Sequence, residues 1–161
     1  MEEKQQAYKS LKMRQQKELA RSLLRKWYMI DDVIGYYIAQ LASTERLIDD
    51  TEGLLDKIEA PYRQALAGSL EERYKALTEI VQSLLRWKSA IDNCELHEMT
   101  PAEQEVFVDR YVKRKLWKMI RPEHYDGQKK LSINRDILYK VANAITRADA
   151  EAQQALDKQK K

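Results

Sequence analysis

Residues 23–58, LLRKWYMIDDVIGYYIAQLASTERLIDDTEGLLDKI, carry the pattern that decides the fold. Apolar or small side chains recur there at alternating steps of four and three residues, which keeps one stripe on one side of a helix. The stripe consists of Leu23, Trp27, Ile30, Ile34, Tyr37, Leu41, Thr44, Ile48, Thr51, Leu55 and Ile58, and it is widened by Leu24, Val33, Ile38, Leu47 and Leu54. We therefore expect a long packed helix, weakened only at Gly35 and the pair Asp31–Asp32.

A second helix is predicted after the stretch APYRQALAGS, residues 60–69. Pro61 is compatible with a first helical turn, and Gly68 suits a helix C-terminus. Ser69 and Glu72 then match the capping-box pattern of a new helix start. That helix would carry Leu70, Tyr74, Leu77, Val81, Leu84 and Ile91 on one face. Two amphipathic helices joined by a short turn fold back on each other, so residues 1–93 are predicted to form a helical hairpin in an all-α protein.

The composition limits the class of protein. The chain has 161 residues, 43% hydrophobic and 34% charged, which fits one domain, or a small domain with a helical extension. Cys94 is the only cysteine, so no internal disulfide can form, and a reducing compartment is expected. No apolar run approaches the roughly 18 residues of a membrane span, and no signal peptide is visible. We expect a soluble, cytoplasmic protein that does not enter a membrane.

The net charge of +3 is spread unevenly along the chain. Residues 1–30 contain eight Lys and Arg against three Asp and Glu, and residues 100–148 contain eleven against six. Residues 31–60 contain two Lys and Arg against eight Asp and Glu. This asymmetry indicates an acidic scaffold flanked by two regions that can meet a polyanion. The alternative is that the charges only solvate helix faces.

Residues 99–157 are predicted to form a separate three-helix module. Its first helix starts at Thr100, which can cap, with Pro101 at the first helical position and Glu103 completing a capping box. KRKLWKMIR, residues 113–121, would be a short second helix, and PEHYDGQKK, residues 122–130, a loop. The third helix would run to about Asp157.

The third helix is predicted to begin with Asn134 as its N-cap, and Ile133 and Leu138 occupy the positions of a hydrophobic staple. Its inward side chains would be Ile137, Leu138, Val141, Ala142 and Ile145. Its outward side chains would be Arg135, Asp136, Tyr139, Lys140, Asn143 and Arg147, available to bases and phosphates of DNA. Arg and Asn suit bidentate contacts with guanine and adenine. Phosphate contacts would come from Lys113, Arg114, Lys115, Lys118 and Arg121, and from Lys129 and Lys130 in the loop.

Three segments resemble a known DNA-binding family. TPAEQEVFVDRYV resembles the first helix of the sigma-factor region-four helix-turn-helix, and LWKMI and LSINRDILYKVANAI resemble its second and recognition helices. A helical part followed by such a module is similar to phage late-gene transcriptional regulators of the RinA and ArpU type. The resemblance implies sequence-specific binding of double-stranded DNA near a promoter in a bacterial host cell, with RNA polymerase as a further partner. RPEHYDGQKK departs from the family, because about ten residues stand where the turn is normally a few.

No pattern in the sequence points to an enzyme, a cofactor or a metal site. Cys94 and His97 have a ligand-like spacing, but a structural zinc site needs four ligands, and His124 is the only other histidine. The carboxylates of adjacent acidic residues do not converge on a helix, which applies to the pairs Asp31–Asp32, Asp49–Asp50 and Glu71–Glu72. Glycine-rich phosphate loops and nucleophile elbows are missing from the sequence. Each tryptophan, Trp27, Trp87 and Trp117, lies beside apolar residues at helical spacing, which favours packing over stacking on single strands.

We therefore expect a transcriptional regulator whose hairpin mediates oligomerisation, most simply as a dimer, or faces the polymerase. The N-terminal basic run would extend the DNA contact or only solvate a helix; it comprises Lys4, Lys9, Lys12, Arg14, Lys17, Arg21, Arg25 and Lys26. Two alternatives stay open: a non-enzymatic helical adaptor that binds protein, and a phage DNA-packaging recognition subunit. Packaging subunits usually form large rings and carry their DNA motif first, whereas here it comes second.

Overall fold

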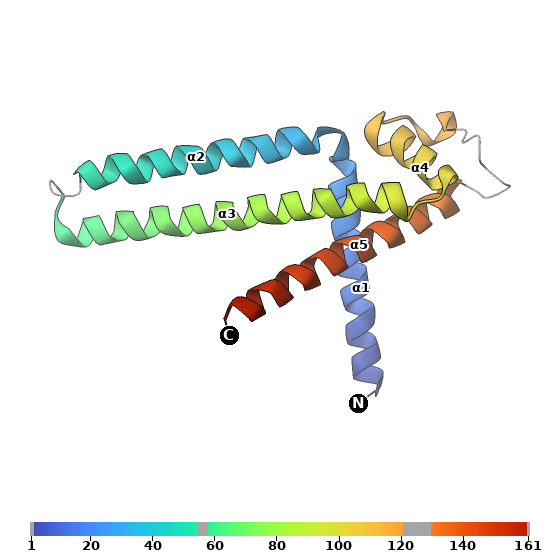
Figure 1. Ribbon diagram of the computed structural model, residues 1–161, viewed down its shortest axis with the longest axis horizontal. Helices are drawn as coiled ribbons and strands as arrows, with labels where there is room; N and C mark the ends of the chain where they lie inside the picture. The colour runs from blue at the N-terminus through green and yellow to red at the C-terminus, as the bar shows by residue number, and fades with distance from the viewer. Residues whose placement is uncertain (1, 55–57, 121–129, 161) are drawn as a thin grey trace. The chain divides into compact units, whose positions relative to one another are not determined.

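The computed structural model describes residues 2–54, 58–120 and 130–160, with residues 7–11 and 54 described by their backbone only. Figure 1 shows its elements: α1 (Glu2–Arg25), η1 (Trp27–Met29), α2 (Ile30–Leu54), α3 (Ala60–His97), α4 (Pro101–Phe107), η3 (Val108–Val112), η4 (Trp117–Met119) and α5 (Lys130–Gln159). All of these are helical, so the predicted all-α class is confirmed. Among the described helices, none combines the length and the apolar character that crossing a membrane requires.

The chain divides into two compact units whose boundaries differ from the predicted ones. Unit 2 is residues 31–85, and unit 1 combines residues 1–30 with residues 86–161. The prediction instead placed residues 1–93 in one hairpin and residues 99–157 in a separate module. The difference arises because α1 does not belong to the hairpin: it packs against α5, with Ala20, Leu23 and Leu24 buried.

Unit 2 is the helical hairpin that the sequence predicts. α2 and the first part of α3 run antiparallel and side by side (Figure 1). Hydrogen bonds join the helices: Arg73 Nη2 donates to Gln40 Oε1 at 3.2 Å, and the Tyr74 hydroxyl donates to Glu45 Oε1 at 2.9 Å. Thr44, fully buried on the predicted stripe, satisfies its hydroxyl by donating to the Gln40 carbonyl at 2.8 Å.

Helix boundaries around the hairpin differ from the predicted ones at two places. The stripe that starts at Leu23 is not on one helix, because the 3₁₀ turn η1 separates α1 from α2. Asp31 and Asp32 consequently lie in the first turn of α2, where carboxylates are favourable near the positive end of the helix dipole. α3 passes through Gly68 and Ser69 without a break, so the predicted helix end and capping box are wrong there.

The core of unit 1 forms where α5 packs against α1 and α4. The rings of Trp27 and Phe107 meet edge to face with centroids 6.2 Å apart. The centroid of the Tyr111 ring lies 5.7 Å from that of Phe107. Ile91 and Ile120 are fully buried in the same unit. An aromatic from the turn after α1 is therefore packed against a residue 80 positions later in the chain.

The predicted helix start at Thr100 is confirmed. Glu103 N donates to Thr100 Oγ1 at 3.2 Å, and Thr100 N donates to Glu103 Oε1 at 2.9 Å, which completes the capping box with Pro101 in the first turn. The helix then widens into the π-helical turn η3. The predicted second helix is shorter than expected, since only the 3₁₀ turn η4 is helical within residues 113–120.

The start of the third helix is corrected by the structure. α5 begins at Lys130, so Asn134 lies inside the helix and is not its N-cap. Its side chain has another partner, because Asn134 Oδ1 accepts a hydrogen bond from the Tyr111 hydroxyl. Ile133 and Leu138 are buried as helix-interior residues and do not form a staple. The predicted loop, apart from Lys130, lies outside the described residues.

Candidate nucleic-acid interface

α5 has one buried and one exposed face in the region that the sequence singled out. Its inward residues were predicted as Ile137, Leu138, Val141, Ala142 and Ile145, and all of them are buried. Together with Ile133 they recur at steps of three and four residues, and α5 packs on α1 and α4. This packing fixes which side of α5 is left to solvent.

The exposed face of α5 carries a row of three polar side chains. Arg135, Tyr139 and Asn143 are all exposed and are separated by steps of four residues. At 1.5 Å per residue, the row spans about 12 Å along the helix, which matches the width of a DNA major groove. Arg135 Nη2 makes one long contact with Ser132 Oγ at 3.3 Å. Asp136 is also exposed beside the row.

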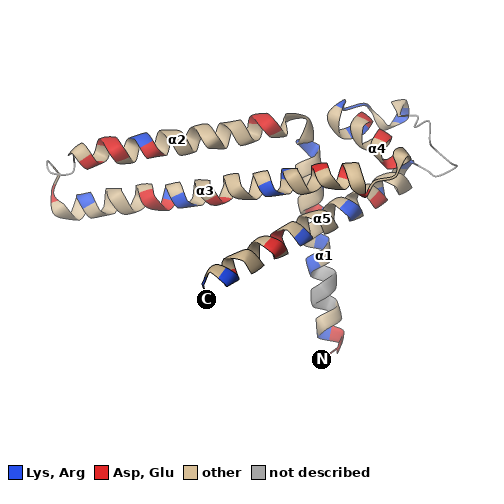
Figure 2. Cartoon of the chain, viewed as in Figure 1, with Lys and Arg blue, Asp and Glu red and all other residues tan. Residues whose placement is uncertain are grey.

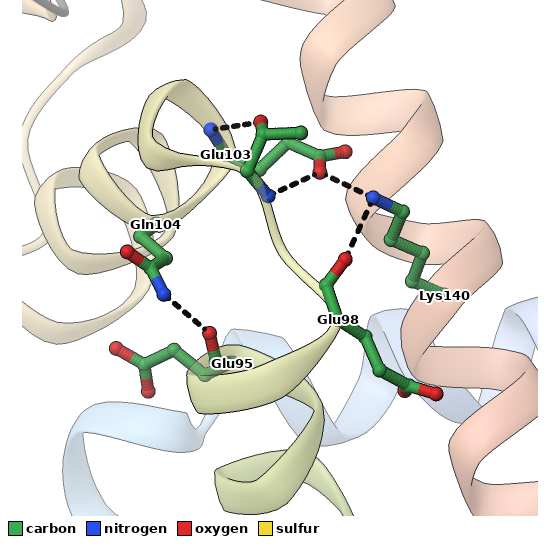
Figure 3. A network of polar contacts seen from close by, with 6 residues as sticks. Glu95, Glu98, Glu103, Gln104 and Lys140 are labelled. Atoms are coloured by element: carbon green, nitrogen blue, oxygen red, sulfur yellow. Dashed lines mark hydrogen bonds and ion pairs between the residues drawn. The ribbon is translucent and has the colours of Figure 1, made fainter.

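Lys140 and Arg147, predicted to face DNA, are used inside unit 1. Figure 3 shows Lys140 Nζ between the Glu98 carbonyl, at 2.9 Å, and Glu103 Oε1, at 2.5 Å. Glu103 is only 5% exposed, so the lysine supplies the charge that this buried carboxylate needs. Arg147 pairs with the carboxylate of Glu98. These two cations connect α5 to the end of α3 and the start of α4.

The ionisation of this network follows from its contacts. The hydrogen bond from Arg147 lowers the pKa of Glu98, and the same bond raises the pKa of Arg147. Burial raises the pKa of the Cys94 thiol to about 12, and the nearby Glu98 adds to this effect. The protonated thiol is therefore the form of Cys94 that this buried environment favours.

The basic segment before η4 is partly engaged as well. Lys115 Nζ pairs with Asp109 Oδ1 at 3.1 Å, and the Arg114 guanidinium stacks over the Tyr28 ring at 4.1 Å. Arg114 has φ of 57°, a left-handed conformation that is uncommon for a side-chain-bearing residue. Lys113 and Lys118 are exposed and form no ion pair with any described residue. These two are the cations of the segment best placed for phosphate.

Of the remaining predicted cations, Lys130 is the one that lies among the described residues. Lys130 Nζ donates to the Trp117 carbonyl at 2.7 Å, which ties η4 to the first turn of α5. The guanidinium of Arg110 lies 4.8 Å from the centroid of the same Trp117 ring. Arg121 and Lys129 lie outside the described residues.

The N-terminal basic run, predicted either to extend the DNA contact or to solvate a helix, contains a stripe of cations on α1. Arg14, Lys17, Arg21 and Arg25 follow steps of three, four and four residues, so they share one face of the helix. Buried Leu23 lies on the opposite side of the helix, whereas Lys17 borders the buried Ala20 and Leu24, three and seven residues later. Arg14, Arg21 and Arg25 are exposed, Lys17 is half-buried, and Arg21 pairs with Glu18. The spacing that reveals the stripe was present in the N-terminal basic run.

Metal binding is the other chemistry to consider among the described residues. They contain no group of three or more His, Cys, Asp or Glu that could hold a metal ion. Cys94 is buried, whereas His97 is exposed.

Comparison of the chain with protein-family models, with curated proteins and with solved structures found no match. The resemblance to the region-four helix-turn-helix and to RinA- and ArpU-type regulators therefore rests on the three quoted segments alone.

Proposed function

We propose that the chain binds double-stranded DNA through unit 1. The observation that carries the proposal is a separation of charge between the units. Unit 1 contains 24 Lys and Arg against 15 Asp and Glu, a formal charge of +9, whereas unit 2 contains five against eleven, a formal charge of −6. Figure 2 shows how acidic residues outnumber basic ones along α2. A net charge of +3 conceals a strongly basic unit suited to a polyanion.

Base contacts in this proposal come from Arg135, Tyr139 and Asn143 on the exposed face of α5. The arginine fork matches guanine and the asparagine amide matches adenine, and an α-helix fits the major groove. α5 is held from behind by α1 and α4. Because the second helix of the predicted module is reduced to η4, we propose that one long supported helix reads DNA, without a regular helix-turn-helix.

Phosphate contacts in this proposal come from Lys113 and Lys118 and from the α1 stripe. Four other cations are assigned a role in holding unit 1 together, since each already has a carboxylate or carbonyl partner: Lys115, Lys130, Lys140 and Arg147. A regulator of transcription, in particular of phage late genes, is the biological role that the sequence resemblance implies. RNA polymerase as a partner rests on the same resemblance.

The test is the binding of the full chain to a fluorescent duplex as salt is raised from about 50 to 200 mM. If Arg14, Lys17, Arg25, Lys113 and Lys118 each neutralise one phosphate, the log–log slope should be roughly −4.5. No binding at the lowest salt, or a slope near zero, would contradict the proposal.

Specificity is tested with two substitutions on cognate and random duplexes. Arg135→Ala should weaken cognate binding by about 1–3 kcal/mol and leave random binding nearly unchanged. Lys118→Ala should weaken both duplexes alike. Equal behaviour of the two variants would show that α5 does not read bases. Cognate DNA would be taken from the region beside the protein's own gene.

A second candidate function is a protein-binding adaptor. It is favoured by an open groove in unit 1 whose lining includes Leu96 and Met119, exposed by 68% and 63%, together with Val108. Exposed apolar side chains in a groove are typical of protein contacts. The salt series separates the two functions, because an adaptor would not bind duplex DNA more tightly at low salt.

A further inference from the structure

The hairpin of unit 2 has two flanks, and hydrogen bonds between its helices identify them. Arg73 and Gln40 meet on one flank, which we name the Arg73 side. Tyr74 and Glu45 meet on the opposite flank, which we name the Glu45 side. Residues three, four, seven or eleven positions from these markers lie on the same face of their helix, so other side chains can be assigned to a flank.

Exposed apolar side chains gather on the Arg73 side. Tyr36 and Leu47 lie four residues before and seven after Gln40, and they are exposed by 60% and 47%. Tyr62, Leu66 and Ile80 lie eleven and seven residues before Arg73 and seven after it, with exposures of 68%, 40% and 38%. The Glu45 side holds only Ile38 and Leu85 among the exposed large apolar residues described in unit 2.

Acidic residues lie on both flanks, and four of them line the Glu45 side. Asp49 and Glu52 lie four and seven residues after Glu45, and Glu71 lies three residues before Tyr74. They share the Glu45 side with Glu45 itself. Carboxylates also lie along the outer edge of the Arg73 side, because Asp32 is four residues before Tyr36 and Glu72 is three residues after Ser69.

The exposed apolar area on the Arg73 side is large for a free surface. With about 200 Å² for a large side chain, the five exposed fractions amount to roughly 500 Å². Contiguous apolar patches beyond a few hundred Å² mark interaction sites, and a standard interface buries about 800 Å² per partner. The small residues Ser43, Ser69 and Ala76 lie three or four positions from Gln40 or Arg73, on the same flank, and would allow helices to approach closely.

We propose that the Arg73 side binds the same side of a second copy, so that two hairpins form a four-helix bundle. A second copy offers helices of matching length and the same apolar stripe, in the isologous pairing of a twofold dimer. The formal charge of −6 on unit 2 disfavours DNA or an anionic membrane as the occupant. The inference identifies the surface of the expected dimer and does not depend on DNA binding.

The experiment is sedimentation equilibrium of the full chain without DNA, comparing Ile80→Glu with Ile38→Glu. Both variants place the same charge on an exposed isoleucine of the hairpin, one on each flank. Wild type and Ile38→Glu should sediment as dimers, at twice the monomer mass of 19.0 kDa. Ile80→Glu should raise the dimer dissociation constant by at least about 100-fold.

Tyr62→Glu serves as a second variant on the Arg73 side, because Tyr62 is 68% exposed and contributes little to the hairpin's own core. It should also dissociate the dimer while the far-ultraviolet circular dichroism keeps its wild-type helix content. A wild-type chain that stays monomeric at high concentration would overturn the proposal. So would dimers that survive both Ile80→Glu and Tyr62→Glu, or that Ile38→Glu disrupts equally.

Discussion

Lys140 and Lys118 show, at the scale of single residues, how neighbours determine whether a lysine can reach DNA. Both belong to the basic second half of the chain, and the sequence predicts both as DNA contacts. Lys140 is committed to Glu103 and to the Glu98 carbonyl, whereas Lys118 is exposed. The partners of Lys140 lie 37 and 42 residues away in sequence, so no local pattern predicts the contact.

Lys140→Met should lower the free energy of unfolding by about 1–3 kcal/mol, because it leaves the buried Glu103 carboxylate without its cation. Lys118→Met should change stability by less than about 0.5 kcal/mol, as for most exposed substitutions. Urea unfolding followed by circular dichroism measures both. Equal stabilities of the two variants would mean that the Lys140 contacts contribute nothing to folding.

Cys94 should resist alkylation. The folded thiol has a pKa of about 12, against 9.0 for an ordinary cysteine. Iodoacetamide at about pH 9 should therefore modify the native protein at least about 100-fold more slowly than the urea-unfolded protein, since the thiolate is the reactive form. Similar rates would show that Cys94 is accessible and ionised in the folded chain.

Ionisation of Cys94 should make the free energy of unfolding depend on pH in the alkaline range. The unfolded chain loses the Cys94 proton near pH 9, whereas the folded chain keeps it to about 12. The stabilising contribution is therefore complete below pH 9 and is lost as the pH rises toward 12. Cys94→Ala should show a flatter pH dependence in this range than wild type.

At the scale of helices, the sequence predicted most elements but not all of their ends. Thr100 marks a true helix start because its partner Glu103 is three residues away, so the whole capping box is local. Gly68 and Ser69 resemble a helix boundary, but α3 continues through them without a break. Asn134 has the residue type of a cap, but it bonds to Tyr111 from another helix. Local signals fail where a long-range contact outweighs them.

Gly68→Ala should stabilise the protein. Gly68 lies inside α3, and a Cβ added there meets no atom within 4 Å. Alanine should increase the free energy of unfolding by about 0.5–1 kcal/mol, because glycine has greater freedom in the unfolded chain. Gly35→Ala, at an equally open position in α2, is the matched substitution. A destabilised Gly68→Ala variant would indicate a break in α3 at this position.

For the whole molecule, the sequence did not reveal which helices belong to which of the two units. The pairing of two long amphipathic helices was predicted because both stripes and the short turn are local, but the predicted bounds, residues 1–93, differ from those of unit 2. α1 was assigned to it by continuity of the heptad pattern, whereas α1 packs against α5, more than 100 residues later. The consequence for the interface is that the basic stripe of α1 and the exposed row of α5 belong to the same unit.

The contribution of α1 to DNA binding can be tested by removing two charges. Arg14→Gln with Arg25→Gln removes exposed cations from the stripe, and Arg46→Gln with Lys75→Gln removes two exposed cations from the hairpin. Net charge falls equally in the two double variants. If α1 contacts phosphates, the first pair should flatten the log–log salt slope by about 1.8, at roughly 0.9 per phosphate, and the second pair should leave it unchanged. A long-range effect of total charge would shift both slopes alike and would assign α1 to structural support of α5 only.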